Sequence, residues 1–206
     1  MNFISECKKL IDYYCNDIVV RNNGTILLSS DGNLFCKHMF YRGVTDELLN
    51  ALVKSYSGSL PKSYTDFLRF SNGANLYWVT IKADTDIKFS QSMLNIYGIP
   101  SKQPCKYEEE PFDIRLEDLS RHRQTPDFWL KIGSYILPND PSCSLHDLFI
   151  DVYDLKVYSC IKNQLNIDKI WNDLDECLCE LFELLSKAEE IIELEHETGD
   201  GSMCSS

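Results

Sequence analysis

The chain is poor in positive charge and has no long apolar run. Its 20 lysine and arginine residues stand against 32 aspartates and glutamates, which gives a formal net charge of −12 at pH 7. A surface this acidic repels phosphate backbones and anionic lipid headgroups, so nucleic acid and membranes are poor partners. No segment approaches the length that a helix needs to cross a bilayer. The charge favours a basic protein partner, because long-range attraction raises association rates.

Signals for secretion and for disulfide bonding are also missing. The first residues, MNFISECKKLIDYYC, lack the basic start and the uninterrupted apolar core of a signal peptide. Nine cysteines are scattered along the sequence, and their odd number and wide spacing favour reduced thiols. We therefore expect a cytoplasmic protein without a disulfide framework.

Motifs of catalysis and metal binding are scarce. The sequence contains no Gly-x-Ser-x-Gly, no phosphate-binding glycine-rich loop and no dinucleotide fingerprint. Only Cys143-x-x-His146 and Cys177-x-Cys179 suggest a metal, and cysteines two residues apart on a helix point to different faces. The histidines lie far apart in the sequence, at His38, His122, His146 and His196. These features predict a binding protein with no enzymatic activity, no metal and no cofactor.

Length and hydrophobic content predict one folded domain. The 206 residues with a hydrophobic fraction of 44% suit a single core. Residues 1–40 are expected to form an extension packed on that core, with a helix at 3–14 and a hairpin at 22–40. Asn23-Gly24 and Asp31-Gly32 are the turn signals of this hairpin.

Two short helices should follow the extension. The first has Thr45 as its N-cap, and the second starts at Pro61 and stops at the left-handed signal Asn72-Gly73. The side chains expected to be buried on the first helix are Leu48, Leu49, Leu52, Val53 and Tyr56.

The middle of the chain has the composition of β-strands. Its segments are short, aromatic and β-branched, and turn residues separate them. A short helix is also expected within 112–119, and a tight turn at Asp154. The expected strands are 76–82, 87–89, 93–99, 128–136, 147–152 and 157–158.

The most regular apolar periodicity lies near the end of the sequence. Steps of three and four residues predict a long C-terminal helix that begins at Ile167. Between Asp168 and Glu197, eleven acids and two lysines leave a net charge of −9, so this segment carries most of the acidic excess. Residues 198–206 are small and polar, and we expect them to be disordered. The expected apolar stripe is Ile167, Ile170, Trp171, Leu174, Leu178, Leu181, Leu185, Ala188 and Ile192.

The order of these elements resembles the SUKH superfamily, which includes the Smi/Knr-type proteins. The resemblance covers roughly residues 40–185. It rests on the two consecutive helices, on Phe112-Asp113-Ile114, on Trp129-Leu-Lys-Ile-Gly133 before a strand pair, and on Trp171 near a closing helix. The signature residues, for which packing and capping roles are expected, are Leu60, Pro61, Tyr64, Phe67, Leu68, Asn72, Gly73, Trp129, Gly133 and Trp171.

The resemblance implies both a fold and a function. The fold is a single α+β domain, spanning 41–197 here, with a mixed, largely antiparallel sheet partly wrapped by helices. Many bacterial members resemble immunity proteins that bind and occlude a cognate polymorphic or contact-dependent toxin, often a nuclease. Fungal members are regulatory interaction proteins, and a regulatory scaffold is the alternative interpretation. A metal-dependent hydrolase built on 108–118 and His122 is a third.

Two groups of acids are candidates for contact with a basic toxin domain. One lies in a proline-bounded loop and its continuation, and the other on the exposed side of the final helix. The simpler interpretation of both groups is a solvated surface, and exposed ion pairs contribute only about 0.2 to 1 kcal/mol each. The candidates are Glu108, Glu109, Glu110, Asp113, Glu117 and Asp118 in the first group, and Asp173, Glu176, Glu180 and Glu183 in the second.

Overall fold

The structure, a computed structural model, describes residues 2–29, 36–55, 60–82, 88–99, 115–117, 129–137, 144–162 and 166–198. Within these residues ten strands form one sheet, and every pairing between them is antiparallel. The strands are β1 (Ile18–Val20), β2 (Ile26–Ser29), β3 (Cys36–Arg42), β4 (Ser71–Lys82), β5 (Lys88–Ile96), β6 (Arg115–Glu117), β7 (Trp129–Ile136), β8 (Leu145–Asp151), β9 (Val157–Ile161) and β10 (Ile167–Trp171). Their order across the sheet is β1-β2-β3-β4-β5-β7-β8-β9-β10, and β6 pairs with β7.

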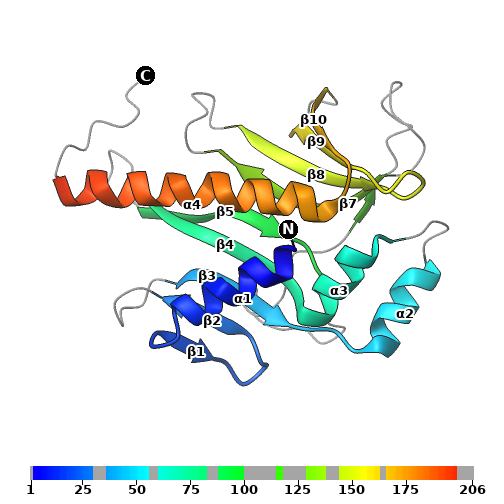
Figure 1. Ribbon diagram of the computed structural model, residues 1–206, viewed down its shortest axis with the longest axis horizontal. Coiled ribbons are helices and arrows are strands. Elements are labelled where there is room, and N and C mark those ends of the chain that lie inside the picture. Colours follow the sequence, from blue (N-terminus) through cyan, green and yellow to red (C-terminus); the bar gives the residue numbers. More distant parts are fainter. Residues whose placement is uncertain are drawn as a thin grey trace.

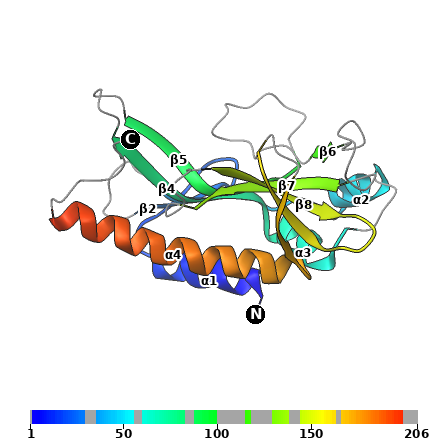
Figure 2. The same ribbon diagram turned by 90° about the horizontal axis from the view of Figure 1, so that it is seen from above.

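Four helices accompany the sheet. They are α1 (Phe3–Tyr13), α2 (Asp46–Ser55), α3 (Lys62–Phe70) and α4 (Leu174–Thr198). Helices α1 and α4 run side by side along one face of the sheet (Figure 1 and Figure 2). The prediction of a single α+β domain with a largely antiparallel sheet and a long C-terminal helix is confirmed, and no parallel pair occurs among the described strands.

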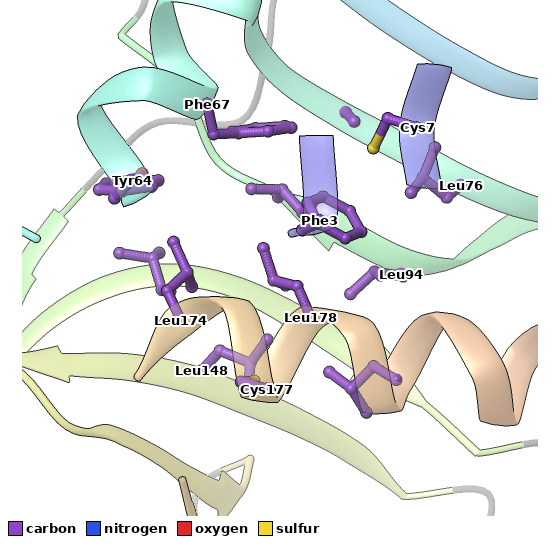
Figure 3. Packing of buried hydrophobic residues seen from close by; sticks show 14 of the residues in the cluster. Phe3, Cys7, Tyr64, Phe67, Leu76, Leu94, Leu148, Leu174, Cys177 and Leu178 are labelled. Carbon is purple, nitrogen blue, oxygen red and sulfur yellow. The ribbon is translucent and has the colours of Figure 1, made fainter. Parts of the chain in front are cut away.

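One large apolar cluster fills the space between the helices and the sheet. Figure 3 shows Phe3 of α1, Phe67 of α3 and Leu178 of α4 pointing into this space, and all three are buried. The rings of Phe3 and Phe67 lie 5.6 Å apart, centroid to centroid. Because Phe3 belongs to this cluster, the first helix shares the core of the later elements. The boundaries proposed at residues 40 and 197 stay a prediction.

The buried stripe of α4 follows the expected spacing over four turns. Its members from Leu174 to Ala188 are buried at steps of three and four residues, and they face the sheet. Burying one leucine side chain stabilises a fold by about 1.5 to 3 kcal/mol, so this stripe is a main source of stability. The side chain of Ile192 lies outside the described residues.

A second, small cluster lies apart from the large one. Trp129 of β7, Phe149 of β8 and Cys160 of β9 form it, with Tyr158 packed against them. Tyr158 stacks on Trp129 at 4.6 Å with an interplanar angle of 18°. Phe149 alternates along β8 with Leu148 and Ile150 of the large cluster, and alternate residues of a strand point to opposite faces. The second cluster therefore occupies the sheet face opposite α4.

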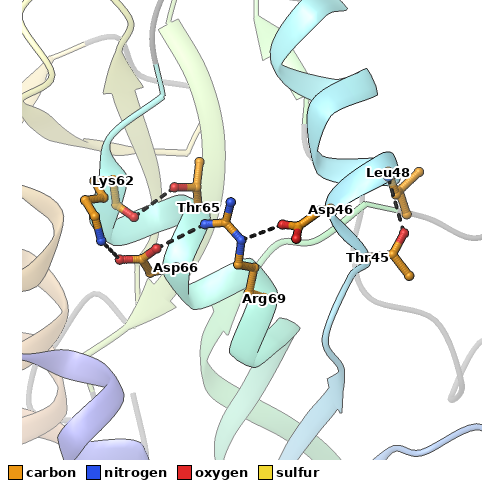
Figure 4. Close-up of polar contacts among 7 residues, drawn as sticks. All are labelled: Thr45, Asp46, Leu48, Lys62, Thr65, Asp66 and Arg69. Atoms are coloured by element: carbon orange, nitrogen blue, oxygen red, sulfur yellow. Dashed lines mark hydrogen bonds and ion pairs between the residues drawn. The ribbon is translucent and has the colours of Figure 1, made fainter.

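The two short helices α2 and α3 are linked through one arginine. Arg69 of α3 donates to Asp46 of α2 at 2.9 Å and to Asp66 at 3.1 Å (Figure 4). The Asp46 carboxylate raises the pKa of Arg69, while Lys62 lowers the pKa of Asp66. The predicted cap of α2 is confirmed, because Thr45 Oγ1 accepts the Leu48 amide at 3.4 Å.

The stripe expected on α2 needs one correction. Leu49 is buried, and Leu48 and Leu52 pack against the core. Val53 is 38% exposed, because α2 contacts the rest of the molecule along a narrow side. Tyr56 lies outside the described residues.

The C-terminal helix begins later than its periodicity predicts. Ile167 and Ile170 belong to strand β10, which pairs with β9, and α4 begins only at Leu174. The apolar residues of β10 and those of α4 follow one another at the same three- and four-residue spacing. Periodicity alone therefore predicted one helix where the structure has a strand and a helix. The ladder with β9 and a cap at Asp173 separate them.

Two further predictions in the sheet region were wrong. The strands expected at 87–89 and 93–99 are one strand, β5, whose polar centre continues the ladder with β4. The helix expected within 112–119 is contradicted at 115–117, which pair with β7 as β6. In both cases backbone pairing with a neighbouring strand decides the conformation, whatever the side-chain pattern.

Candidate partner-binding surface

The first turn of α4 holds two of the predicted acids in capping roles. Asp173 Oδ1 accepts the Glu176 amide at 2.8 Å, which satisfies a free donor at the helix start. Glu176 reaches back and accepts the backbone amide of Asn172 at 2.8 Å and its side-chain amide at 3.0 Å. Both carboxylates are exposed. Both side chains face solvent, but their oxygens already accept hydrogen bonds at the start of α4.

Glu180 is the centre of a contact between α4 and β10. It accepts hydrogen bonds from Lys169 and from Trp171 Nε1, the latter at 3.0 Å. Partial burial acts to raise the pKa of Glu180, but these two hydrogen bonds outweigh it and lower the pKa. Lys169 also lies over the Trp171 ring, 5.2 Å from its centroid. Glu180 therefore fastens the last strand to the helix.

Glu183 is the most available of the predicted acids on α4. Its side chain is 68% exposed and forms an i,i+4 pair with Lys187 at 2.6 Å. Such a surface pair contributes little to stability. Charge removal at Glu183 therefore tests partner binding with little effect on folding.

The neighbouring Asp175 has a structural role that the sequence did not reveal. Its Oδ1 accepts the Phe3 amide at 2.9 Å across 172 residues of chain. This bond ties the start of α1 to the start of α4. Its partner is distant in sequence, so no local pattern could have indicated it.

The loop acids fall almost entirely outside the described residues. This applies to Glu108, Glu109, Glu110, Asp113 and Asp118. Glu117 lies at the end of β6, where its backbone pairs with Trp129 of β7, and its side chain is not described. The structure therefore places only the α4 group of candidates.

The exposed side of β10 is a feature that the sequence interpretation missed. Ile167 is 45% exposed and Ile170 is 52% exposed. They stand opposite Cys160 and Tyr158 of β9, so both side chains continue the second cluster toward the sheet edge. Two exposed apolar side chains on one edge strand, beside a buried aromatic cluster, make β10 a candidate for contact with another chain. The sequence signal for a strand here was the β-branching of Ile167 and Ile170. Their helical spacing led to the prediction of a helix instead.

Most of the signature residues have packing roles. Leu60 and Pro61 are at least partly buried, and Tyr64, Phe67 and Leu68 are buried in the large cluster. Tyr64 also donates its hydroxyl to the Tyr97 carbonyl at 3.0 Å. Trp129 belongs to the second cluster, and Trp171 is buried beneath α4.

Asn72 and Gly73 do not end a helix as predicted, because α3 ends at Phe70 and both residues lie in β4. Gly73 has a left-handed backbone, with φ of 93°. Asn72 forms two hydrogen bonds with the backbone of Ile99, at 2.6 and 2.7 Å. Asn72, near the start of β4, thus holds the segment that follows β5.

Gly133 lies where two strands approach closely. A Cβ at this position would stand 2.4 Å from the Asn95 carbonyl oxygen. Any larger residue would push β7 away from β5, so glycine is required for packing and not for chemistry.

His38 is a buried structural histidine. It packs between the rings of Tyr14 and Tyr77, and its Nδ1 accepts the Tyr77 amide at 3.3 Å. Burial lowers the pKa of His38 to about 3, so the ring is neutral at pH 7. The bond supports Tyr77, which has a positive φ of 57°.

His146 and the buried cysteines also lie within the fold. His146 stacks on Tyr135 with centroids 4.8 Å apart, and its Nδ1 lies 3.3 Å from the Asp168 carboxylate. Cys177 is buried and Cys179 partly buried, and burial raises the pKa of both thiols. His122 and Cys143 lie outside the described residues, as does the side chain of His196.

The part of the chain that the structure describes contains neither a metal-ligand cluster nor a membrane-spanning helix. No three potential metal ligands come together among these residues. None of their helices combines the length and the apolarity that a bilayer crossing requires.

Comparison of the chain with known protein families, with curated proteins and with solved structures finds no match. The likeness to the SUKH superfamily therefore depends on the sequence pattern alone and stays a prediction.

Proposed function

We propose that this chain is an immunity protein that binds a basic toxin domain and neutralises it by occlusion. The observation that carries the proposal is the charge. The chain has 32 acidic and 20 basic residues, and eleven acids against two lysines fall between Asp168 and Glu197. The resemblance to the SUKH superfamily over residues 40–185 supports the same function.

The proposed mechanism needs no reaction in this protein. If the toxin is a nuclease, its active site is lined by cationic groups that normally meet phosphates. Carboxylates held on a folded surface can take the place of those phosphates and form charge-assisted hydrogen bonds. Complementary charge then speeds the encounter, and the covered area keeps substrate out.

The proposal is tested by identifying a toxin gene beside this protein's gene and mixing the C-terminal domain of that toxin with this protein. The expected result is a complex that co-purifies and whose formation abolishes the activity of the toxin. Stopped-flow mixing at two ionic strengths should show an association rate that falls with salt, with a smaller change in dissociation. An association rate independent of salt would contradict the electrostatic mechanism.

A matched pair of variants tests whether the acids of α4 contribute more to the association rate than acids elsewhere on the surface. Glu183→Gln removes one exposed charge from α4, and Glu47→Gln removes one from α2, where Glu47 is fully exposed. We expect the Glu183 variant to lower the association rate by about twofold and the Glu47 variant by less. Equal effects would mean that the net charge acts as a whole, without a preferred side.

A further inference from the structure

We infer that the edge which β10 forms among the described strands is the place where the partner docks, by adding an extended basic segment to the sheet. This inference rests on the proposed function and names the surface that performs it. The partner segment would pair with the β10 backbone and lay apolar side chains over Ile167 and Ile170, as in strand-addition complexes.

The first observation is the position of β10. It ends the order of the described strands and pairs only with β9 among them. Its first four residues are exposed. A strand at a sheet edge offers unpaired backbone donors and acceptors, which template the pairing of another strand.

The pairing of β10 with β9 has one irregularity, between Ile167 and Lys169, and the lysine of this strand is engaged by α4. Natural edges are often guarded by a lysine that keeps other strands away. Here Lys169 turns toward α4 and is held by Glu180. The side chains that remain on the other side are Ile167 and Ile170, at 45% and 52% exposure.

The edge is also fixed in place. Trp171 is buried beneath α4 at 2% exposure, and Asp168 lies 3.3 Å from buried His146. These contacts hold the inner side of β10, so little ordering is needed when a partner binds. Binding to a preorganised strand costs less conformational entropy than binding to a mobile one.

The outer side continues an apolar surface. Ile170 stands opposite Tyr158 and Ile167 opposite Cys160, and both partners belong to the region of the second cluster. Tyr158 in turn stacks on Trp129. A partner segment would therefore contact a continuous apolar strip, formed by Ile167 and Ile170 and continued by Tyr158.

The charge around the strip selects a basic occupant. Asp168 has a side chain that is 44% exposed, and Asp173 and Glu176 are exposed just beyond the strand. A second copy of the chain would bring these acids against its own, at a net charge of −12 per chain. A segment with lysine or arginine between apolar residues fits both the strip and the acids.

The opposite edge offers a natural control. β1 is also an edge strand, with Val19 at 56% and Val20 at 64% exposure. It has three residues where β10 has five, so it can form fewer backbone bonds. The same apolar chemistry at β1 should bind the partner segment more weakly.

The test uses a random library of short displayed peptides selected on the full chain. Enriched peptides should alternate apolar residues with lysine or arginine. Their affinity should fall about tenfold in the double variant Ile167→Thr/Ile170→Thr. It should stay within about twofold in the matched double variant Val19→Thr/Val20→Thr on β1. Threonine keeps the β-branch and the charge, and circular dichroism confirms that both variants are folded.

Each other outcome overturns the inference in a distinct way. Basic peptides whose affinity is unchanged by the β10 variants would reject the edge but leave the proposed function standing. A library that yields no basic peptides would reject the inference about the edge, while mixing with the toxin domain would still decide the proposed function. A concentration-dependent dimer in sedimentation, lost in the β10 variant, would show that a second copy takes the edge.

Discussion

The two faces of the sheet differ in what covers them. On the face that carries α1 and α4, strands from both ends of the sheet contribute to one large apolar cluster. On the opposite face, a small aromatic cluster lies beside an ion pair. Leu148 and Ile150 point to the first face, and Asp147 and Phe149 of the same strand point to the second. On the second face Lys131 and Asp147 form an ion pair at 2.9 Å, with side chains only 16% and 12% exposed.

This difference allows variants that lower stability to be distinguished from variants that test the proposed docking surface. The covered face is packed by long elements and tolerates little change, because each lost side chain leaves a cavity. Among the described residues the other face has a smaller apolar cluster, which runs out to the exposed isoleucines of β10. Variants on the covered face should therefore unfold the protein, while variants at the rim of the other face should alter binding.

The largest effect is expected from Leu178→Ala, since Leu178 is 1% exposed in the main cluster. The truncation should lower the free energy of unfolding by about 3 to 4 kcal/mol, from lost burial and a cavity. Urea denaturation measures it. Leu184→Ala on the same helix is the control, because Leu184 is 43% exposed, and it should cost less than about 1 kcal/mol. Similar losses in both variants would refute the placement of α4.

The next effect is expected on the opposite face. Lys131→Met leaves Asp147 without its ion pair in a largely buried setting. The free energy of unfolding should fall by roughly 2 to 3 kcal/mol, below the loss for a fully buried pair because both side chains keep some contact with water. Denaturation of the double variant Lys131→Met/Asp147→Leu should recover most of the loss, since no unpaired charge remains. If the double variant is as unstable as Lys131→Met, the loss does not come from the unpaired charge of Asp147.

The sequence predicted those elements whose signals are local. Pro61 at a helix start and the buried face through Tyr64 and Phe67 suffice for α3, and aromatic, β-branched runs suffice for β7 and β8. The sequence could not predict β10, because the spacing of Ile167, Ile170 and Trp171 continues into that of α4. Only pairing with β9 resolves it.

The candidate site shows the same limit. Composition was enough to select the acids of α4, but their individual roles depend on contacts across the fold. Glu180 is held by Lys169, and Asp175 accepts a bond from Phe3 at the other end of the chain. Long-range hydrogen bonds of this kind leave no periodic trace in a sequence.

A smaller effect concerns the response of the covered face to pH. His38 has a folded-state pKa of about 3, against about 6.5 in an unfolded chain. The unfolded state therefore binds more protons as the pH falls below about 6.5, and stability should decrease from there to about pH 3. Between pH 7 and 5 the loss from this group is about 2 kcal/mol. Denaturation of His38→Asn, which keeps an acceptor for Tyr77, should show a shallower dependence; an unchanged slope would contradict the burial of His38.

The smallest effect distinguishes two acids on α4 that composition treats as equal. Asp173→Ala removes the cap that accepts the Glu176 amide, and it should lower the free energy of unfolding by about 1 kcal/mol. Glu183→Ala removes an exposed i,i+4 partner of Lys187, and the change should stay within about 0.5 kcal/mol. Thermal melts of both variants give the comparison.

If the two losses of stability are equal, Asp173 is not a cap. If they differ as expected, any loss of partner affinity at Asp173 must be corrected for stability, whereas a loss at Glu183 reports on the interface directly.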